Sequence, residues 1–108
     1  MTGNATLNND GIREIPISES ASRKGDFAEY YAITWLWDNG YEVFPNAGGS
    51  GPIDMVAIKD EEITLVDVKT LGLNTRSHKT RTQEQKNMGV VFLGFEPDTR
   101  KLRWINHR

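Results

Sequence analysis

The amino-acid sequence predicts an α/β fold, with a mixed β-sheet core flanked by helices in the order αβββαββ. Three observations lead to this prediction. One long helical segment ends at a glycine, two apolar runs flank a short polar turn as in a β-hairpin, and a continuous apolar run follows a short helix. Such a run is typical of a strand covered on both faces. A chain of 108 residues is expected to form one compact domain.

The N-terminal part of the chain divides into an arm and a helix. Residues 1–17 are polar and rich in asparagine, which predicts a flexible arm, and residues 18–108 are expected to form the single domain. A helix is predicted from about residue 22 to residue 39, because Gly40 then stands where a helix C-terminus favours positive φ. Its apolar residues cover more than one face. We therefore expect the helix to be mostly buried or to contact a second subunit.

The middle of the chain predicts three strands. Residues 41–44 form a short strand, and a glycine-rich loop follows over residues 46–52. Residues 53–58 and 63–69 then read as the two strands of a hairpin, joined by the polar turn 59–62.

The register of this hairpin places two carboxylates opposite each other. If the strands pair symmetrically about the bond between residues 60 and 61, Asp54 faces Asp67 at a Cβ distance of ~5 Å, where like charges are destabilising. A hard divalent cation such as Mg²⁺ binds oxygen ligands and would offset that repulsion. Lys69 lies on the same face as Asp67. The pattern predicts a metal site suited to phosphodiester cleavage; the alternative is a pair of exposed strand-end charges, with Lys69 as a salt-bridge partner.

The C-terminal part predicts a crossover. Residues 71–81 are polar and basic, and residues 82–88 form a short helix that ends at Gly89. The apolar run 90–95 and a last strand at 102–105 follow. A helix between the hairpin and the apolar run predicts a right-handed crossover to a parallel strand.

Charge is distributed unevenly along the chain. Residues 1–68 carry 4 Lys/Arg and 12 Asp/Glu, for a net charge of −8, whereas residues 69–108 carry 9 and 3, for +6. This asymmetry favours nucleic-acid binding, with ordinary solvated charge as an equal alternative.

The absence of cysteine excludes disulfides and a thiolate zinc site. No apolar stretch approaches the ~20 residues of a membrane span. The N-terminus lacks a signal-peptide core, so an intracellular, cytoplasmic location is expected.

Three short segments occur in an order and spacing typical of a nuclease family. Arg23-Lys24-Gly25-Asp26-Phe27-Ala28-Glu29 opens the helix, the loop 47–54 ends in an aspartate, and Val66-Asp67-Val68-Lys69 closes the hairpin. In these segments the chain resembles the PD-(D/E)XK nuclease superfamily, most closely the archaeal-type Holliday junction resolvases. The resemblance covers roughly residues 23–70, and the acid before the lysine is Asp67 rather than the commoner glutamate.

The resemblance implies a restriction-endonuclease-like fold and a set of roles. Asp54 and Asp67 would ligate Mg²⁺, with Mn²⁺ as a substitute, helped by the main-chain carbonyl of Val68. Glu29 would complete the site from the helix, directly or through a metal-bound water. Lys69 would position the attacking water or stabilise the charge of the transition state, and we favour electrostatic stabilisation over general base catalysis.

The short helix offers a further candidate. Thr82 and Gln85 fit a capping box, in which Gln85 serves only to cap the helix. Related nucleases often have a glutamine here near the metal site, so Gln85, or as a weaker candidate Gln83, could reach the substrate. The segment 84–86 repeats the acid-any-lysine pattern of the hairpin, but these side chains do not share a helix face.

The expected function is that of a Mg²⁺-dependent DNA endonuclease acting on branched DNA such as Holliday junctions, as a homodimer. Basic residues would contact the sugar-phosphate backbone, and the Ser50 hydroxyl would reach the scissile phosphate unless its loop is only a connector. The alternatives are a nicking or repair endonuclease with another substrate, and a catalytically silent DNA-binding module of the same fold. The candidate DNA contacts are Arg23, Lys24, Ser50, Arg76, Lys79, Arg81 and Lys86.

Overall fold

A computed structural model describes residues 6–7, 13–14, 20–72 and 80–105. In the range 20–105 the order of elements is αβββαββ, as the sequence predicts. Two further strands, of two residues each, precede it. The elements are β1 (Thr6–Leu7), β2 (Arg13–Glu14), α1 (Ala21–Asp38), β3 (Glu42–Pro45), β4 (Met55–Lys59), β5 (Glu62–Thr70), α2 (Gln83–Met88), β6 (Val91–Glu96) and β7 (Lys101–Ile105).

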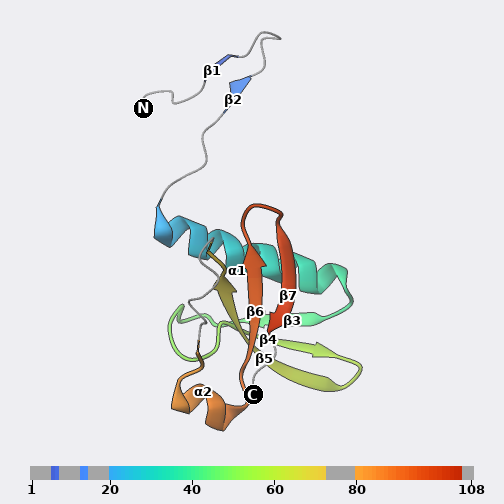
Figure 1. Cartoon of the computed structure of the whole chain (residues 1–108). Coiled ribbons are helices and arrows are strands. Elements are labelled where there is room, and N and C mark those ends of the chain that lie inside the picture. The colour runs from blue at the N-terminus through green and yellow to red at the C-terminus, as the bar shows by residue number, and fades with distance from the viewer. Residues whose placement is uncertain (1–5, 8–12, 15–19, 73–79, 106–108) are drawn as a thin grey trace.

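The last five strands form one mixed sheet in the order β3-β4-β5-β6-β7. Only β5 and β6 are parallel among these neighbours, and α2 lies in the connection between them, so the predicted crossover to a parallel strand is confirmed. Helix α1 lies across one face of the sheet (Figure 1). The core forms between this helix and that face, from Ala32, Leu36, Met55, Ala57, Val66 and Leu93.

Helix α1 begins and ends where its sequence provides caps. The Ser20 side chain accepts a hydrogen bond from the Arg23 N–H at 3.4 Å, and Gly40 has φ +90° just after the helix. Three small or aliphatic residues of the helix are buried. Tyr30 and Trp37 are 70% and 71% exposed, so the expectation that the helix is mostly buried is wrong. Ile33 and Trp35 also pack against the core. Contact with a second subunit, the other alternative for this helix, stays a prediction.

The hairpin of β4 and β5 has the register that the sequence predicts. Val56 pairs with Leu65 and Ile58 with Ile63, around a two-residue turn. The turn residues, Asp60 and Glu61, have φ +51° and +69°. Positive φ at both central positions matches the right-handed twist of the two strands. The register that aligns Asp54 with Asp67 is therefore fixed by the turn.

Helix α2 is short and capped at both ends. The Thr82 side chain accepts from the Gln85 N–H, the Gln85 side chain accepts from the Thr82 N–H, and Gly89 follows with φ +77°. Figure 1 shows α2 at the end of the sheet where β6 begins. The helix therefore lies beside the open end of the hairpin.

Strands β1 and β2 pair with each other, with Thr6 opposite Glu14 and Leu7 opposite Arg13. The sequence did not predict this pairing. The rest of the segment 1–17 lies outside the described residues, so its flexibility stays a prediction. Residues 73–79 also lie outside the described residues.

Candidate active site

Asp54 is held against β5 by its main chain and by its side chain. It precedes β4 directly, and its N–H donates to the Val66 carbonyl at 2.8 Å. The Val68 N–H donates to Asp54 Oδ2 at 2.7 Å. These two bonds lie on either side of Asp67 in the chain. The carboxylates of Asp54 and Asp67 therefore meet across the end of the hairpin, as the register predicts.

Asp67 is buried and has two donors on one oxygen. Its exposed fraction is 6%. Lys69 Nζ lies 3.1 Å from Asp67 Oδ2, and Gln85 Nε2 donates to the same oxygen at 3.0 Å. Burying a carboxylate is costly unless it is paired and hydrogen-bonded, and both contacts reduce that cost. The interpretation of Asp67 as an exposed strand-end charge is therefore wrong.

Lys69 is placed by the strand and by an aromatic ring. Strand alternation puts it on the face of Asp67, and its Nζ lies 5.0 Å from the centroid of the Phe92 ring. Phe92 is buried on β6, directly beside Asp67 in the parallel register. A cation is attracted to the face of such a ring. The ammonium group is therefore held between a carboxylate and an aromatic surface, at the edge of the site.

The two carboxyl groups are electrostatically coupled. Burial raises the pKa of Asp54 to about 7, and a hydrogen bond between the Asp54 and Asp67 side chains acts in the same direction. The Val68 N–H opposes this rise in pKa because it stabilises the ionised form. The negative charges of Asp67 and Glu29 raise the pKa of Asp54 further. At neutral pH this site therefore favours one positive charge, either a proton or a cation, between the two groups.

Glu29 belongs to the same electrostatic neighbourhood. Burial raises the pKa of Glu29, and the negative charges of Asp26 and Asp67 raise it further. Within the described residues, however, no three or more His, Asp or Glu side chains gather closely enough to hold a metal ion between them. In this arrangement a water molecule would have to link Glu29 to an ion at Asp54 and Asp67.

The Asp54–Asp67 pair fits a hard divalent cation. A hydrogen bond between two carboxyl groups needs a proton on one of them, and a divalent ion could replace that proton. Mg²⁺ is commonly held by one or two carboxylates, with water and phosphate oxygens filling the other positions. The donor set therefore suits Mg²⁺ or Mn²⁺ without a third protein carboxylate.

Gln85 caps α2 and also contacts the carboxylate pair, whereas its contact with a substrate stays a prediction. It is 6% exposed, and its Oε1 accepts from the Thr82 N–H at 3.0 Å. Its Nε2 donates to Asp67 and, at 2.9 Å, to the Pro52 carbonyl. Capping alone is therefore too narrow an account. Both amide hydrogens are used within the protein, so Gln85 orients Asp67. Gln83 instead donates to Asn87 at the surface.

The predicted DNA contacts lie in several parts of the chain. Arg23, Lys24 and Ser50 are exposed, as is Lys86 on α2. Arg81 instead donates to the Val90 carbonyl at 3.2 Å, so it also holds the start of β6 in place. Arg76 and Lys79 lie outside the described residues.

Two contributors were missed by the sequence reasoning. Phe92 read as an ordinary core residue, and its contact with Lys69 depends on the parallel register of β5 and β6. Asn46 read as part of a loop, but it forms several hydrogen bonds within the loop that leads to Asp54. An asparagine before a run of glycines was the available signal.

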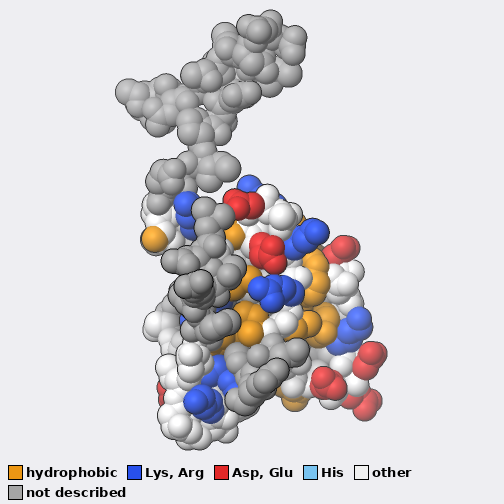
Figure 2. Space-filling model, in the orientation of Figure 1, with side chains coloured by type: hydrophobic (Ala, Val, Ile, Leu, Met, Phe, Trp, Pro, Cys, Tyr) orange, Lys and Arg blue, Asp and Glu red, His pale blue; other side chains and the backbone are white. Residues whose placement is uncertain are grey.

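The sheet face away from α1 carries exposed apolar side chains. Phe44 and Ile63 on this face are 55% and 64% exposed. Figure 2 shows apolar surface over the strands, with basic and acidic side chains around it. By strand alternation, Asp67 and Lys69 belong to this face.

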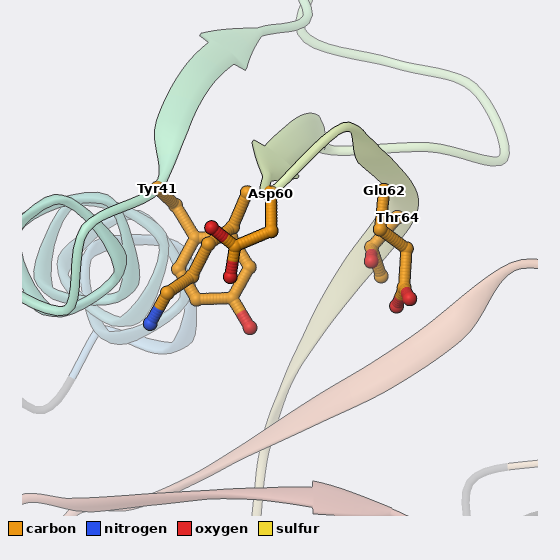
Figure 3. Close-up of a pocket in the computed structure, with 5 residues that line it drawn as sticks. Tyr41, Asp60, Glu62 and Thr64 are labelled. Carbon is orange, nitrogen blue, oxygen red and sulfur yellow. The ribbon is translucent and has the colours of Figure 1, made fainter.

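A polar cavity of about 160 Å³ lies at the other end of the hairpin, lined by Tyr41, Lys59, Asp60, Glu62 and Thr64 (Figure 3). The Lys59–Glu62 pair lies four register positions from the Met55–Val66 pair, which is roughly 13 Å along the strands. Lys59 Nζ donates to the Asn39 carbonyl at 2.7 Å and so caps α1. This cavity is separate from the carboxylate pair.

Comparisons with known proteins show a shared fold. No protein-family model matches the chain, and no curated protein matches it in sequence. A solved structure of a bacterial homing endonuclease, I-Ssp6803I, is similar to it with a TM-score of 0.63 and 19% sequence identity. The match covers 80% of this chain and 68% of that chain. At this identity the likeness establishes the fold alone.

No helix within the described residues is long and apolar enough to cross a membrane.

Proposed function

We propose that this protein is a Mg²⁺-dependent DNA endonuclease with a restriction-endonuclease-like fold. The observation that carries the proposal is the Asp54–Asp67 pair, joined by a hydrogen bond, with Lys69 Nζ 3.1 Å from Asp67. The fold shared with a homing endonuclease supports the same reaction class. Each of these contacts also has a simpler structural explanation, but a domain that only binds DNA would gain nothing from two opposed carboxylates of which one, Asp67, is buried.

The residues have distinct proposed roles. Asp54 and Asp67 would hold the ion, with the Val68 carbonyl as a third ligand. The bound ion would polarise the scissile phosphate and lower the pKa of a water molecule. Lys69 would stabilise the negative charge that develops on the phosphate, since its ammonium group is already held at the site. Gln85 would keep Asp67 in position, and Glu29 would contact the site through water.

The proposed substrate is branched DNA, such as a Holliday junction. Support comes from residues 23–70, whose motifs resemble those of archaeal-type Holliday junction resolvases. The exposed Arg23, Lys24 and Lys86, with Arg76 and Lys79, would supply contacts to phosphates, which set affinity without reading sequence. Ser50 lies in the loop before Asp54 and would donate to the scissile phosphate.

The proposed enzyme acts as a homodimer, which would allow cuts on two strands. Tyr30 and Trp37 are exposed one heptad apart on α1, so they share a helix face and offer apolar surface to a second copy. Sedimentation of the wild type should give a dimer, and Tyr30→Glu should give a monomer. Ile63→Glu, on the opposite sheet face, is the control. A monomeric wild type would exclude this dimer.

The test is cleavage of labelled four-way junction, linear duplex and single-stranded DNA in Mg²⁺. Asp67→Ala should abolish cleavage while the variant still binds the junction. Glu84→Ala is the matched control, because Glu84 also precedes a lysine by two residues but is exposed on α2.

Each failure has a distinct meaning in this experiment. Full activity in Asp67→Ala would exclude this site. Equal cutting of linear duplex would exclude the resolvase preference and favour a nicking or repair endonuclease. Binding without any cleavage in Mg²⁺ or Mn²⁺ would favour a catalytically silent DNA-binding module.

A further inference from the structure

Asn46 uses its side chain to tie together the loop before Asp54. Its Oδ1 accepts from the Gly48 N–H at 2.9 Å. Its Nδ2 donates to two carbonyl oxygens, that of Ser50 at 2.9 Å and that of Ile53 at 3.0 Å. One exposed side chain therefore bonds to the beginning, the middle and the end of this loop.

The main chain of Asn46 is bonded to the same loop and to Asp54 itself. The β3–β4 register ends with Pro45 opposite Met55, and the next pair along is Asn46 opposite Asp54. The Asn46 N–H donates to the Asp54 carbonyl at 2.8 Å, and the Gly49 N–H donates to the Asn46 carbonyl at 3.2 Å. Asn46, which follows β3, and Asp54, which precedes β4, consequently form one row with Asp67 of β5.

We propose that Asn46 is a positioning residue for Asp54: its amide fixes the loop 46–54 so that the carboxylate enters the site in register. The loop contains three glycines, of which Gly49 and Gly51 have φ +71° and +120°. Glycine has the largest backbone freedom in the unfolded or loosened state. Without the three side-chain hydrogen bonds of Asn46, the backbone of Ile53 and Asp54 would become more mobile along with the glycines.

Asparagine suits this task for a chemical reason. Its amide offers an acceptor and two donors on one short side chain, and the loop uses both functions. Serine could still accept from the Gly48 N–H, as in a serine turn, but it is too short to reach both carbonyl groups. Alanine could do neither. The series from asparagine through serine to alanine therefore loosens the loop in steps.

The direct experiment is hydrogen exchange at the Val68 amide, because that N–H donates to the Asp54 side chain. Asn46→Ala should speed exchange at Val68 and Asp54, with Asn46→Ser in between, while exchange in the core of β6 stays unchanged. Asn87→Ala is the matched control, since Asn87 is also exposed and accepts a side-chain bond, from Gln83. Unchanged exchange at Val68 in both Asn46 variants would overturn the proposal. If Asn46→Ala does not fold, the serine variant decides.

The consequence for catalysis rests on the proposed endonuclease function. Loss of a group that orients a metal ligand without itself binding the metal typically costs about 10–100-fold in metal affinity or activity. Asn46→Ala should therefore need about 10-fold more Mn²⁺ for half-maximal cleavage. Saturating Mn²⁺ should restore its rate, and DNA affinity without metal should not change. A rate loss that metal does not restore would contradict positioning of Asp54. If the wild type neither binds Mn²⁺ nor cleaves, the proposed function fails, and the exchange data alone decide the role of Asn46.

Discussion

The β4–β5 hairpin carries acidic side chains at both of its ends, and the two ends have different chemistry. At the open end, Asp54 and Asp67 face each other, and Asp67 is buried with Lys69 and Gln85 on one oxygen. At the turn end, Asp60 and Glu62 are exposed around a polar cavity. Acidity alone therefore does not define a site. A site is instead defined by burial, by carboxylates that face each other on neighbouring strands, and by donors held in place beside them.

The two lysines of the hairpin give the largest contrast. Lys69→Met should lower cleavage about 100-fold or more, because the site loses a preorganised positive charge. Lys59→Met, at the turn end, should leave cleavage unchanged and cost about 0.5–1 kcal/mol of stability through its lost bond to the Asn39 carbonyl. Single-turnover cleavage and urea unfolding of both variants measure this. Equal activity of the two variants would contradict the assignment of Lys69.

The two glutamines of α2, one buried near the carboxylate pair and one at the surface, should differ in how much they stabilise the protein. Gln85→Ala should destabilise the fold by about 2–3 kcal/mol, because the Thr82 N–H and the Pro52 carbonyl lose their partner near a buried carboxylate. Gln83→Ala removes only a surface bond to Asn87, and it should cost no more than about 0.5 kcal/mol. The free energy of unfolding in urea checks both values. A similar loss of stability in Gln85→Ala and Gln83→Ala would mean that the buried hydrogen bonds of Gln85 do not stabilise the fold.

The coupled carboxyl pair should make stability depend on pH. Because the folded-state pKa of Asp54 is raised to about 7, the native state holds a proton that the unfolded state has released between about pH 4 and pH 7. Stability should therefore fall as pH rises through this window, by no more than about 2 kcal/mol, since Asp54 is partly exposed and water screens its charge.

Asp54→Asn should reduce this pH dependence to the part that the raised pKa of Glu29 contributes, whereas Asp60→Asn at the turn end should retain all of it. Mg²⁺ at pH 8 should stabilise the wild type, because a ligand that binds only the folded state shifts the equilibrium toward it. Unfolding curves at pH 5 and pH 8 provide the measurement. An identical pH slope in Asp54→Asn would show that another group is responsible.

The turn end offers the smallest predicted effect. Glu61 has φ +69°, a conformation that glycine adopts at no steric cost. Glu61→Gly should therefore stabilise the protein by about 0.5 kcal/mol, the relief of strain being partly offset by greater freedom in the unfolded chain. Cleavage should not change. Thermal unfolding measures the gain, and a loss of stability would argue against this turn geometry.

Patterns along the chain predicted what depends on local sequence. The turn at Asp60 and Glu61 fixed the register, and the register brought Asp54 to Asp67. Capping signals likewise located both helices. What could not be predicted depends on proximity between distant segments. The Gln85 contact with Pro52 spans 33 residues, and the Phe92 ring reaches Lys69 only through the parallel pairing. Helix α1 also has more aromatic side chains than one sheet face can cover, which is why Tyr30 and Trp37 are exposed and the helix is not mostly buried.

The central claim is that Asp54 and Asp67 bind a divalent cation together. A crystal grown with Mn²⁺ and measured at the manganese absorption edge tests it most directly. We predict an anomalous peak between these two carboxylates, and none at Asp60 or Glu62. A structure with Mn²⁺ in the crystallisation medium, no peak at this position, and the two carboxyl groups still hydrogen-bonded to each other would contradict the claim.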